Sequence, residues 1–144
     1  MTDPVSVARA VIHHDAALRA AAAAVAKAEA LGIQVCVAVV DSNARLVAYL
    51  RMPNAFLISD TVSVAKAASV ASTAGLPADV LEGALSGEGP WVREGLLKLP
   101  GFTLIRGALP LRDGEVLIGA VGVSGGAEAQ DVLCAEAAVA ALAR

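Results

Sequence analysis

Two clusters of short strands, separated by helical segments, constrain the fold most strongly. In the first cluster, IQVCVAVVD (33–41) turns through SNAR into RLVAYLRM (45–52), which predicts a hairpin. The second cluster contains Asp113-Gly114, a strong two-residue hairpin signal, and has three predicted strands: FTLIRG (102–107), ALPLRDG (108–114) and EVLIGAVGV (115–123). Hairpin strands joined by helices predict an α+β fold with a mostly antiparallel sheet, and they disfavour a doubly wound parallel one.

Four helices are predicted around these strands, over residues 4–31, 55–75, 77–87 and 126–143. The first would begin at Pro4, with Asp3 as its cap, and would end at Gly32. A set of residues recurs at intervals of three and four, and this predicts a buried stripe made of Val7, Val11, His14, Leu18, Ala21, Val25 and Ala28. The expected order is therefore α-β-β-α-α-β-β-β-α, in one domain that spans residues 1–144.

The amino-acid composition indicates what kind of core the chain can form and which partners it can bind. The chain is 57% hydrophobic but only 3% aromatic, because alanine and valine supply much of the apolar content. Such side chains bury little area each, so we expect additional burial between the subunits of a homo-oligomer. The net charge is −3 without a basic stripe, which argues against nucleic acid as a partner. No apolar run is long enough to predict a membrane span.

The N-terminal segment and the two cysteines argue against a secreted protein, a disulfide framework and a metal site built on cysteines. The first residues, MTDPVSVARAV, lack a basic region followed by a leucine-rich segment, so we expect no signal peptide and a cytoplasmic protein. Cys36 and Cys134 form no CxxC pair and have no clustered histidines beside them. This predicts buried free thiols, with neither a disulfide framework nor a metal site.

The segment GVSGG (122–126) fits the G-x-S-x-G elbow of serine hydrolases. That motif needs a histidine after the serine, and no histidine follows Ser124. Two interpretations remain open. The turn of Ser124, Gly125 and Gly126 either presents free N–H groups to an anion at a helix N-terminus, or it only shapes the backbone while Ser124 caps the helix.

Several of these segments together resemble the GlcG/HbpS-like haem-binding family, and also the C-terminal domain of PduO-type cobalamin adenosyltransferases. The matching pieces are VCVAVVD (35–41), LVAYLRM (46–52), VAKA (64–67), GALPL (107–111), GEVLIGAVGVSGG (114–126) and Asp131. The resemblance implies a profilin-like domain, a five-stranded antiparallel sheet with helices on both faces. It also implies a homo-oligomer that binds haem or another tetrapyrrole.

The sequence departs from the family pattern at three turns. Ser42, Asn43 and Ala44 replace a Gly-Gly turn, Pro53 and Asn54 replace an Asp-Gly pair, and Ala108 replaces the second glycine of another pair. The methyl group of Ala108 would narrow a pocket at that place. Two outcomes of these differences stay open: a changed ligand preference, or the loss of haem binding.

One cluster of polar residues is a candidate site for a small anionic ligand. The resemblance matches Arg51, Lys66 and Asp131 to the family pattern, and we assign them tentative catalytic roles. Arginine can bind a carboxylate through two hydrogen bonds, and lysine can stabilise an enolate. The expected ligand-binding residues are Asp41, Gly107, Ser124, Gly125 and Gly126. Each of these candidate residues also has a purely structural explanation. Arg51 could form an ion pair with Asp41, and the Lys66 side chain could reach solvent.

His14 is the candidate axial ligand if haem binds, because the predicted helix turns it inward and leaves His13 outside. The leading hypothesis is therefore a small-ligand-binding protein with haem as the expected cofactor. The first alternative is a cofactor-free isomerase or lyase that acts on an enolisable carboxylic acid through Arg51, Lys66 and an acid. The second is an oligomeric accessory protein without chemistry.

Overall fold

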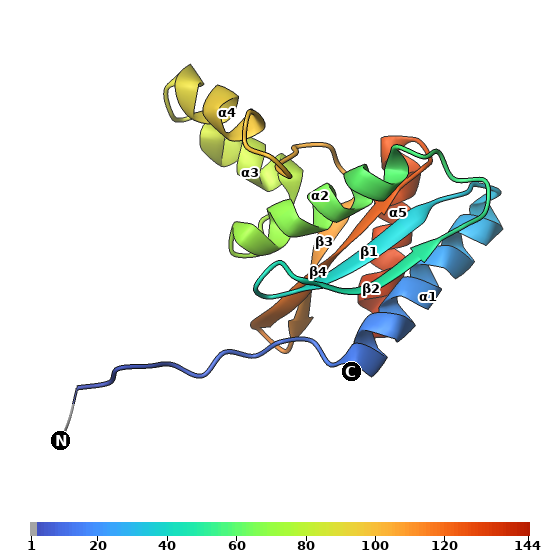
Figure 1. The fold of residues 1–144 in the computed structure, drawn as a ribbon, viewed down its shortest axis with the longest axis horizontal. Coiled ribbons are helices and arrows are strands. Elements are labelled where there is room, and N and C mark those ends of the chain that lie inside the picture. The colour runs from blue at the N-terminus through green and yellow to red at the C-terminus, as the bar shows by residue number, and fades with distance from the viewer. Residues whose placement is uncertain (1–2) are drawn as a thin grey trace.

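The computed structural model describes residues 3–144 and forms an α+β fold with one antiparallel sheet (Figure 1). The sheet has four strands in the order β2-β1-β4-β3. The elements follow in the order α1 (His14–Leu31), β1 (Cys36–Asp41), β2 (Leu46–Arg51), α2 (Ser59–Ser72), α3 (Ala78–Leu85), α4 (Pro90–Leu97), β3 (Ala108–Asp113), β4 (Val116–Ser124) and α5 (Glu128–Ala141). None of the described helices is both long and apolar enough to cross a membrane.

Helices cover both faces of the sheet. One face packs on α1 and α5 through buried valines of the central strands β1 and β4, among them Val37, Val39 and Val121. The opposite face packs on α2 through smaller residues such as Ala38 and Ala120. Because β1 is buried on both faces, its sequence is a continuous apolar run rather than an alternating one.

The strand register brings four chain segments to one end of the sheet. Cys36 at the start of β1 pairs with Arg51 at the end of β2 and with Ser124 at the end of β4. Residues that pair directly point their side chains to the same face. The three side chains therefore form a row across one end of the sheet, beside the start of α2.

The first helix is ten residues shorter at its start than the sequence predicts, since it begins at His14 rather than at residue 4. Residues 3–13 are extended, and Val5 and Val7 are exposed. Tertiary partners satisfy the backbone here, because Ser42 donates to the carbonyl of Ala10 and the N–H of Ile12 donates to Ile118. The His13 side chain then caps α1 through the N–H of Asp15.

The predicted buried stripe is correct at Ala21 and Ala28 but wrong at Val7, Val11, His14 and Leu18, which are exposed. The buried residues are alanines, namely Ala17, Ala20, Ala21, Ala24 and Ala28, whereas Leu18 is 54% exposed. Alanine permits a close approach of α1 to the sheet and to α5, which a stripe of leucine and valine would prevent. In this helix, small size rather than hydrophobicity marks the buried face.

Residues 102–107 form no strand, so the sheet has four strands and not five. Side chains take the place of strand hydrogen bonds in this segment. The N–H of Thr103 donates to Ser69 Oγ, and the N–H of Ile105 donates to Thr103 Oγ1. Before this segment, residues 90–97 form the helix α4, which the sequence did not predict. It contacts α3 and projects with it from the body of the molecule (Figure 1).

Candidate functional site

A buried ion pair lies at the end of β4. Lys66 extends from α2 and its side chain is only 1% exposed. Its Nζ atom lies 3.1 Å from Asp131 Oδ2 and donates to the carbonyl oxygen of Val123 at 2.7 Å. The alternative explanation, that the Lys66 side chain reaches solvent, is therefore wrong. The structure brings Lys66 and Asp131 together, as the sequence analysis anticipated, although both groups are enclosed.

The glycine turn binds a carboxylate that belongs to the chain itself. The N–H of Gly126 donates to Asp131 Oδ1 at 2.9 Å. Burial raises the pKa of Asp131, and the N–H of Gly126 and the charge of Lys66 offset part of that effect. The anion-binding geometry of the turn is thus real, but Asp131 occupies the Gly126 donor. Ser124 does not cap α5, because the N-cap is Ala127.

Local packing and hydrogen bonding explain both Ser124 and Gly107 without a ligand. The Oγ atom of Ser124 lies 3.2 Å from Ser59 Oγ, and both residues are buried. Gly107 has a φ of +126°, and a Cβ atom there would lie 2.7 Å from Lys66 Nζ and 2.7 Å from the carbonyl oxygen of Val123. Any side chain at 107 would therefore displace the ion pair.

Arg51 lies apart from the ion pair. It is exposed on the edge strand β2, two strands away from Ser124 in the row that also contains Cys36. Within residues 3–144, no hydrogen bond or ion pair links Arg51 to Lys66, Ser124 or Asp131. A shared anion pocket for the four residues stays a prediction.

Asp41 lies at the opposite end of the sheet, where it shapes the hairpin. Its Oδ1 atom accepts hydrogen bonds from the N–H groups of Asn43 at 2.8 Å and Arg45 at 3.2 Å. Ala44 adopts a positive φ of 61°, which a glycine would adopt more easily. The carboxylate of Asp41 thus stabilises the turn of Ser42, Asn43 and Ala44, where the family pattern has Gly-Gly. The suggested ion pair between Arg51 and Asp41 is absent, since the two lie at opposite ends of the hairpin.

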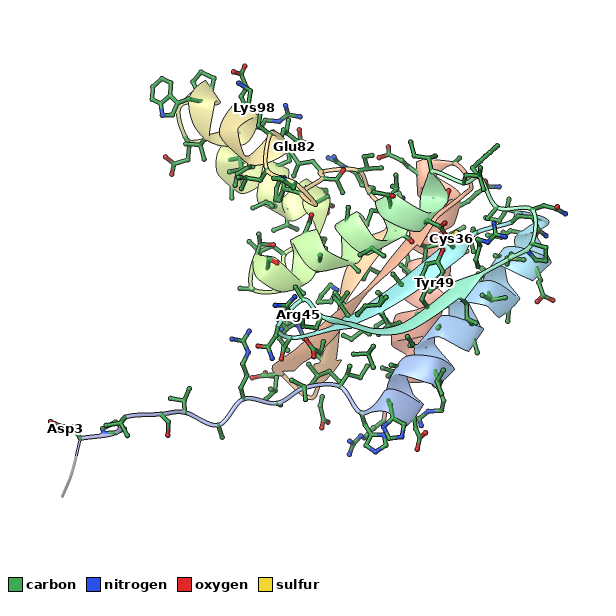
Figure 2. All side chains as sticks on the ribbon, viewed as in Figure 1. Asp3, Cys36, Arg45, Tyr49, Glu82 and Lys98 are labelled. Carbon is green, nitrogen blue, oxygen red and sulfur yellow. The ribbon has the colours of Figure 1, made fainter. Side chains whose placement is uncertain are left out.

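A group of three polar side chains that sequence reasoning missed lies beside Arg51. The Tyr49 hydroxyl donates to the carboxylate of Asp60, and the Cys36 thiol lies 3.6 Å from the same oxygen. Figure 2 labels Cys36 and Tyr49 on the neighbouring strands β1 and β2. Burial raises the pKa of the Cys36 thiol and of the Tyr49 hydroxyl. Tyr49 pairs with Ala38, two residues beyond Cys36, so hairpin register was the signal that would have placed them on one face.

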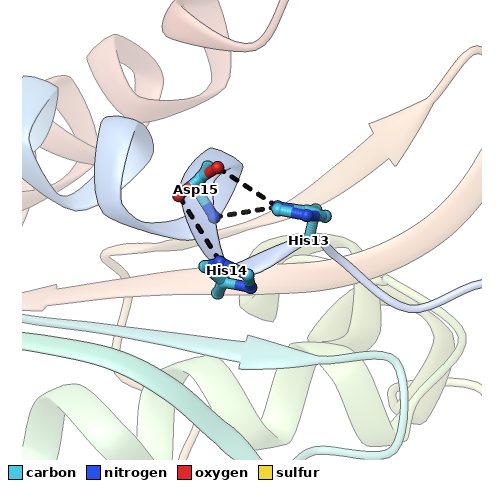
Figure 3. Close-up of side chains that lie close together, drawn as sticks. All are labelled: His13, His14 and Asp15. Carbon is cyan, nitrogen blue, oxygen red and sulfur yellow. Dashed lines mark hydrogen bonds and ion pairs between the residues drawn. The ribbon is translucent and has the colours of Figure 1, made fainter.

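His13 and His14 lie at the first turn of α1, and both are exposed. Their rings stack with centroids 4.2 Å apart, and Asp15 flanks both (Figure 3). The expectation that His14 points inward is wrong. The helix begins at this residue, and its first buried position, Ala17, comes one turn later.

A groove opens beside His13, which we call the α1 groove. It has a volume of about 200 Å³ and lies where the N-terminal segment meets the β3–β4 hairpin and the end of α5. Three of its residues are arginines, Asp113 and His13 are also polar, and the remaining side chains are apolar. Asp113 pairs with one of the arginines, Arg144, at 3.3 Å. The lining includes Val11, His13, Arg19, Arg112, Ile118 and Arg144.

Comparisons with known proteins agree on one family. A family model described as "Haem degrading protein HbpS-like" matches residues 12–140. The corrinoid adenosyltransferase PduO of Citrobacter freundii is 31% identical over 120 residues, which is 83% of this chain but 36% of PduO. The chain thus spans about a third of that relative's length.

Solved structures with a similar fold cover nearly the whole chain. The ORFY protein of Klebsiella pneumoniae has a TM-score of 0.87 at 30% identity, covering 98% of this chain and 97% of its own. A double mutant of Streptomyces reticuli HbpS has a TM-score of 0.83 at 28% identity, covering 100% and 99%. The PduOC complex with haem has a TM-score of 0.81 at 27% identity, covering 92% and 95%.

Proposed function

The chain belongs to the HbpS-like family, and we propose that it binds haem, with His14 as the axial ligand to the iron. One observation carries this proposal: the exposed His13 lines a groove that also contains arginines and apolar side chains, and the exposed ring of His14 stacks on that of His13. A haem can bind through each of those three kinds of group. Imidazole nitrogen is a common ligand of haem iron, guanidinium groups pair with carboxylates such as the propionates, and the macrocycle needs apolar contact. The similar PduOC structure, a complex with haem, supports the same proposal.

The hydrogen bonds at the two histidines favour His14 over His13. His13 Nδ1 accepts the N–H of Asp15 at 3.1 Å, which places the proton of a neutral ring on Nε2 and leaves no free lone pair. The Nε2 atom of His14 has only Asp15 Oδ1 nearby, at 3.6 Å, which is beyond hydrogen-bond distance. His14 can therefore offer a lone pair to iron without losing the cap of α1.

The groove would hold only part of the haem. Its volume of about 200 Å³ is below the 300–1,000 Å³ of pockets that enclose a ligand of cofactor size. Arg19 and Arg112 would pair with the propionates, while Val11 and Ile118 would contact the ring edge. The bound iron would supply redox chemistry and an open coordination position for a small gas molecule.

We also infer a homo-oligomer, in which a second copy would cover part of the exposed surface. Three consecutive apolar residues before α2, namely Phe56, Leu57 and Ile58, are 69%, 78% and 71% exposed. Trp91 on the projecting α4 is 73% exposed. Contiguous apolar surface of this kind is typical of subunit contacts. Light scattering at micromolar concentration tests this inference, and a monomer would contradict it.

The proposal is tested by titrating the metal-free protein with haem and, separately, with iron-free protoporphyrin IX. We expect a shifted Soret band with haem at one equivalent per chain and weaker binding of the iron-free ring, since it lacks the bond to His14. Equal affinity for the two rings would contradict axial ligation, and no spectral change with either ring would contradict the haem site itself.

The alternative of a cofactor-free isomerase or lyase gains no support from the relatives. The two residues that it would use, Lys66 and Asp131, are enclosed in the protein.

A further inference from the structure

The start of α1 gathers three metal-binding side chains in a row along the chain. His13, His14 and Asp15 each offer one donor atom, and these atoms all lie within 4.8 Å of one another (Figure 3). His13 Nδ1 lies 3.8 Å from Asp15 Oδ2, and His14 Nε2 lies 3.6 Å from Asp15 Oδ1. We propose that this triad binds a divalent transition-metal ion in the haem-free protein, and zinc is the probe for it.

The donor set matches the preferences of such an ion. Two imidazoles and one carboxylate suit zinc, and zinc sites with three protein ligands keep a further position open for water. Ligand bonds of about 2.0–2.1 Å place two tetrahedral donors roughly 3.4 Å apart. The contacts at 3.6 and 3.8 Å involve the two different oxygens of Asp15, and the three donor atoms as a set lie within 4.8 Å of one another. Side-chain rotations that shorten the longer separations would complete the site.

These side chains are free to make that adjustment. Those of His13, His14 and Asp15 are 65%, 74% and 68% exposed, and no other described side chain forms an ion pair with them. The site needs His13 Nδ1, which caps α1 by accepting the N–H of Asp15. When the ion binds this lone pair, the exposed N–H of Asp15 can donate to water instead. Losing the cap therefore costs little helix stability.

The negative charge of Asp15 distinguishes this site from the haem site. Haem iron would take His14 alone, whereas the metal ion needs Asp15 as well. Because both use His14, we expect bound zinc to compete with haem. Substitution at Asp15 should weaken metal binding and leave haem binding in place.

The experiment measures zinc affinity of the tag-free, haem-free protein in competition with a chromophoric chelator. We expect one zinc ion per chain and at least tenfold weaker binding in Asp15→Asn, in His13→Ala and in His14→Ala. Glu29→Gln, which removes an exposed carboxylate from the last turn of α1, serves as the matched control and should bind zinc like the wild type. Circular dichroism checks that each variant is folded.

Two results would overturn the metal site: no competition with the chelator, or equal affinity in wild type and Asp15→Asn. A haem titration of the same proteins separates this proposal from the proposed function. Haem binding without zinc binding would reject the metal site alone, and zinc binding without haem binding would reject the haem site alone.

Discussion

Lys66 and Asp131 form an ion pair around the end of the sheet, with 3.1 Å between Nζ and Oδ2. They come from helices on opposite faces, since α2 packs on one face and α5 on the other. The same two groups bind the carbonyl of Val123 and the N–H of Gly126. One buried pair therefore ties together both helical layers, the last strand and the glycine turn.

Replacing one partner of this pair should destabilise the protein strongly. Lys66→Met leaves the Asp131 carboxylate buried without its counter-charge, which costs about 3–5 kcal/mol in such sites. Urea unfolding of Lys66→Met, Asp131→Leu and the double variant measures the effect. We expect the double variant to be more stable than the sum of the single losses predicts, and strict additivity would contradict the coupling.

The pH dependence of stability should show the raised pKa of Asp131. Burial raises that pKa above its ordinary value of 3.8, so the folded state binds the proton more tightly than the unfolded state does. The contribution is fully present below the unfolded pKa and is lost as pH rises through the folded pKa. From about pH 3 to neutral pH, wild type should therefore lose unfolding free energy relative to Asp131→Asn. A gain over the same interval would mean that the charge of Lys66 outweighs burial.

Gly107→Ala should be far more harmful than Gly32→Ala. Both glycines have positive φ, +126° and +71°, but only Gly107 has atoms in the way of a Cβ, while nothing lies within 4 Å at Gly32. Strain alone costs about 1 kcal/mol or somewhat more, and the collision with the ion pair adds to it at Gly107. Thermal unfolding compares the two variants, and equal losses would show that Lys66 shifts without cost.

The two cysteines should be unreactive in the folded protein. Both are buried, and burial raises the pKa of Cys134 to about 11 and that of Cys36 above its ordinary value. Because the thiolate is the nucleophile, a thiol reagent at neutral pH should modify them slowly before unfolding and completely afterwards. Rapid labelling of the native protein would contradict this arrangement.

Hairpin signals and strand periodicity predicted β1, β2, β3 and β4 correctly, because backbone pairing leaves a local mark in the sequence. Residues 102–107 misled the prediction because Ser69, which is distant in sequence, supplies a hydrogen bond to them. The predicted start of α1 was wrong for a similar reason, because hydrogen bonds to Ser42 and Ile118 keep residues 10–12 extended. No local pattern reports such distant partners.

The candidate site was predictable only in part. The family motif singled out Lys66 and Asp131, and the structure joins them. The placement of Asp41 at the far end of the sheet followed from the hairpin register, which sequence reasoning did not use. The orientation of His14 depended on where α1 begins. The helix begins at His14 and not at residue 4, which leaves this side chain exposed in the first turn.

The central claim, haem ligation by His14, is tested most directly by the Soret spectrum of two single variants. His13→Ala and His14→Ala remove neighbouring exposed imidazoles, so neither should unfold the protein. The account predicts that His13→Ala keeps the Soret shift of the wild type on titration with haem, and that His14→Ala loses it. An unchanged shift in His14→Ala would contradict the account.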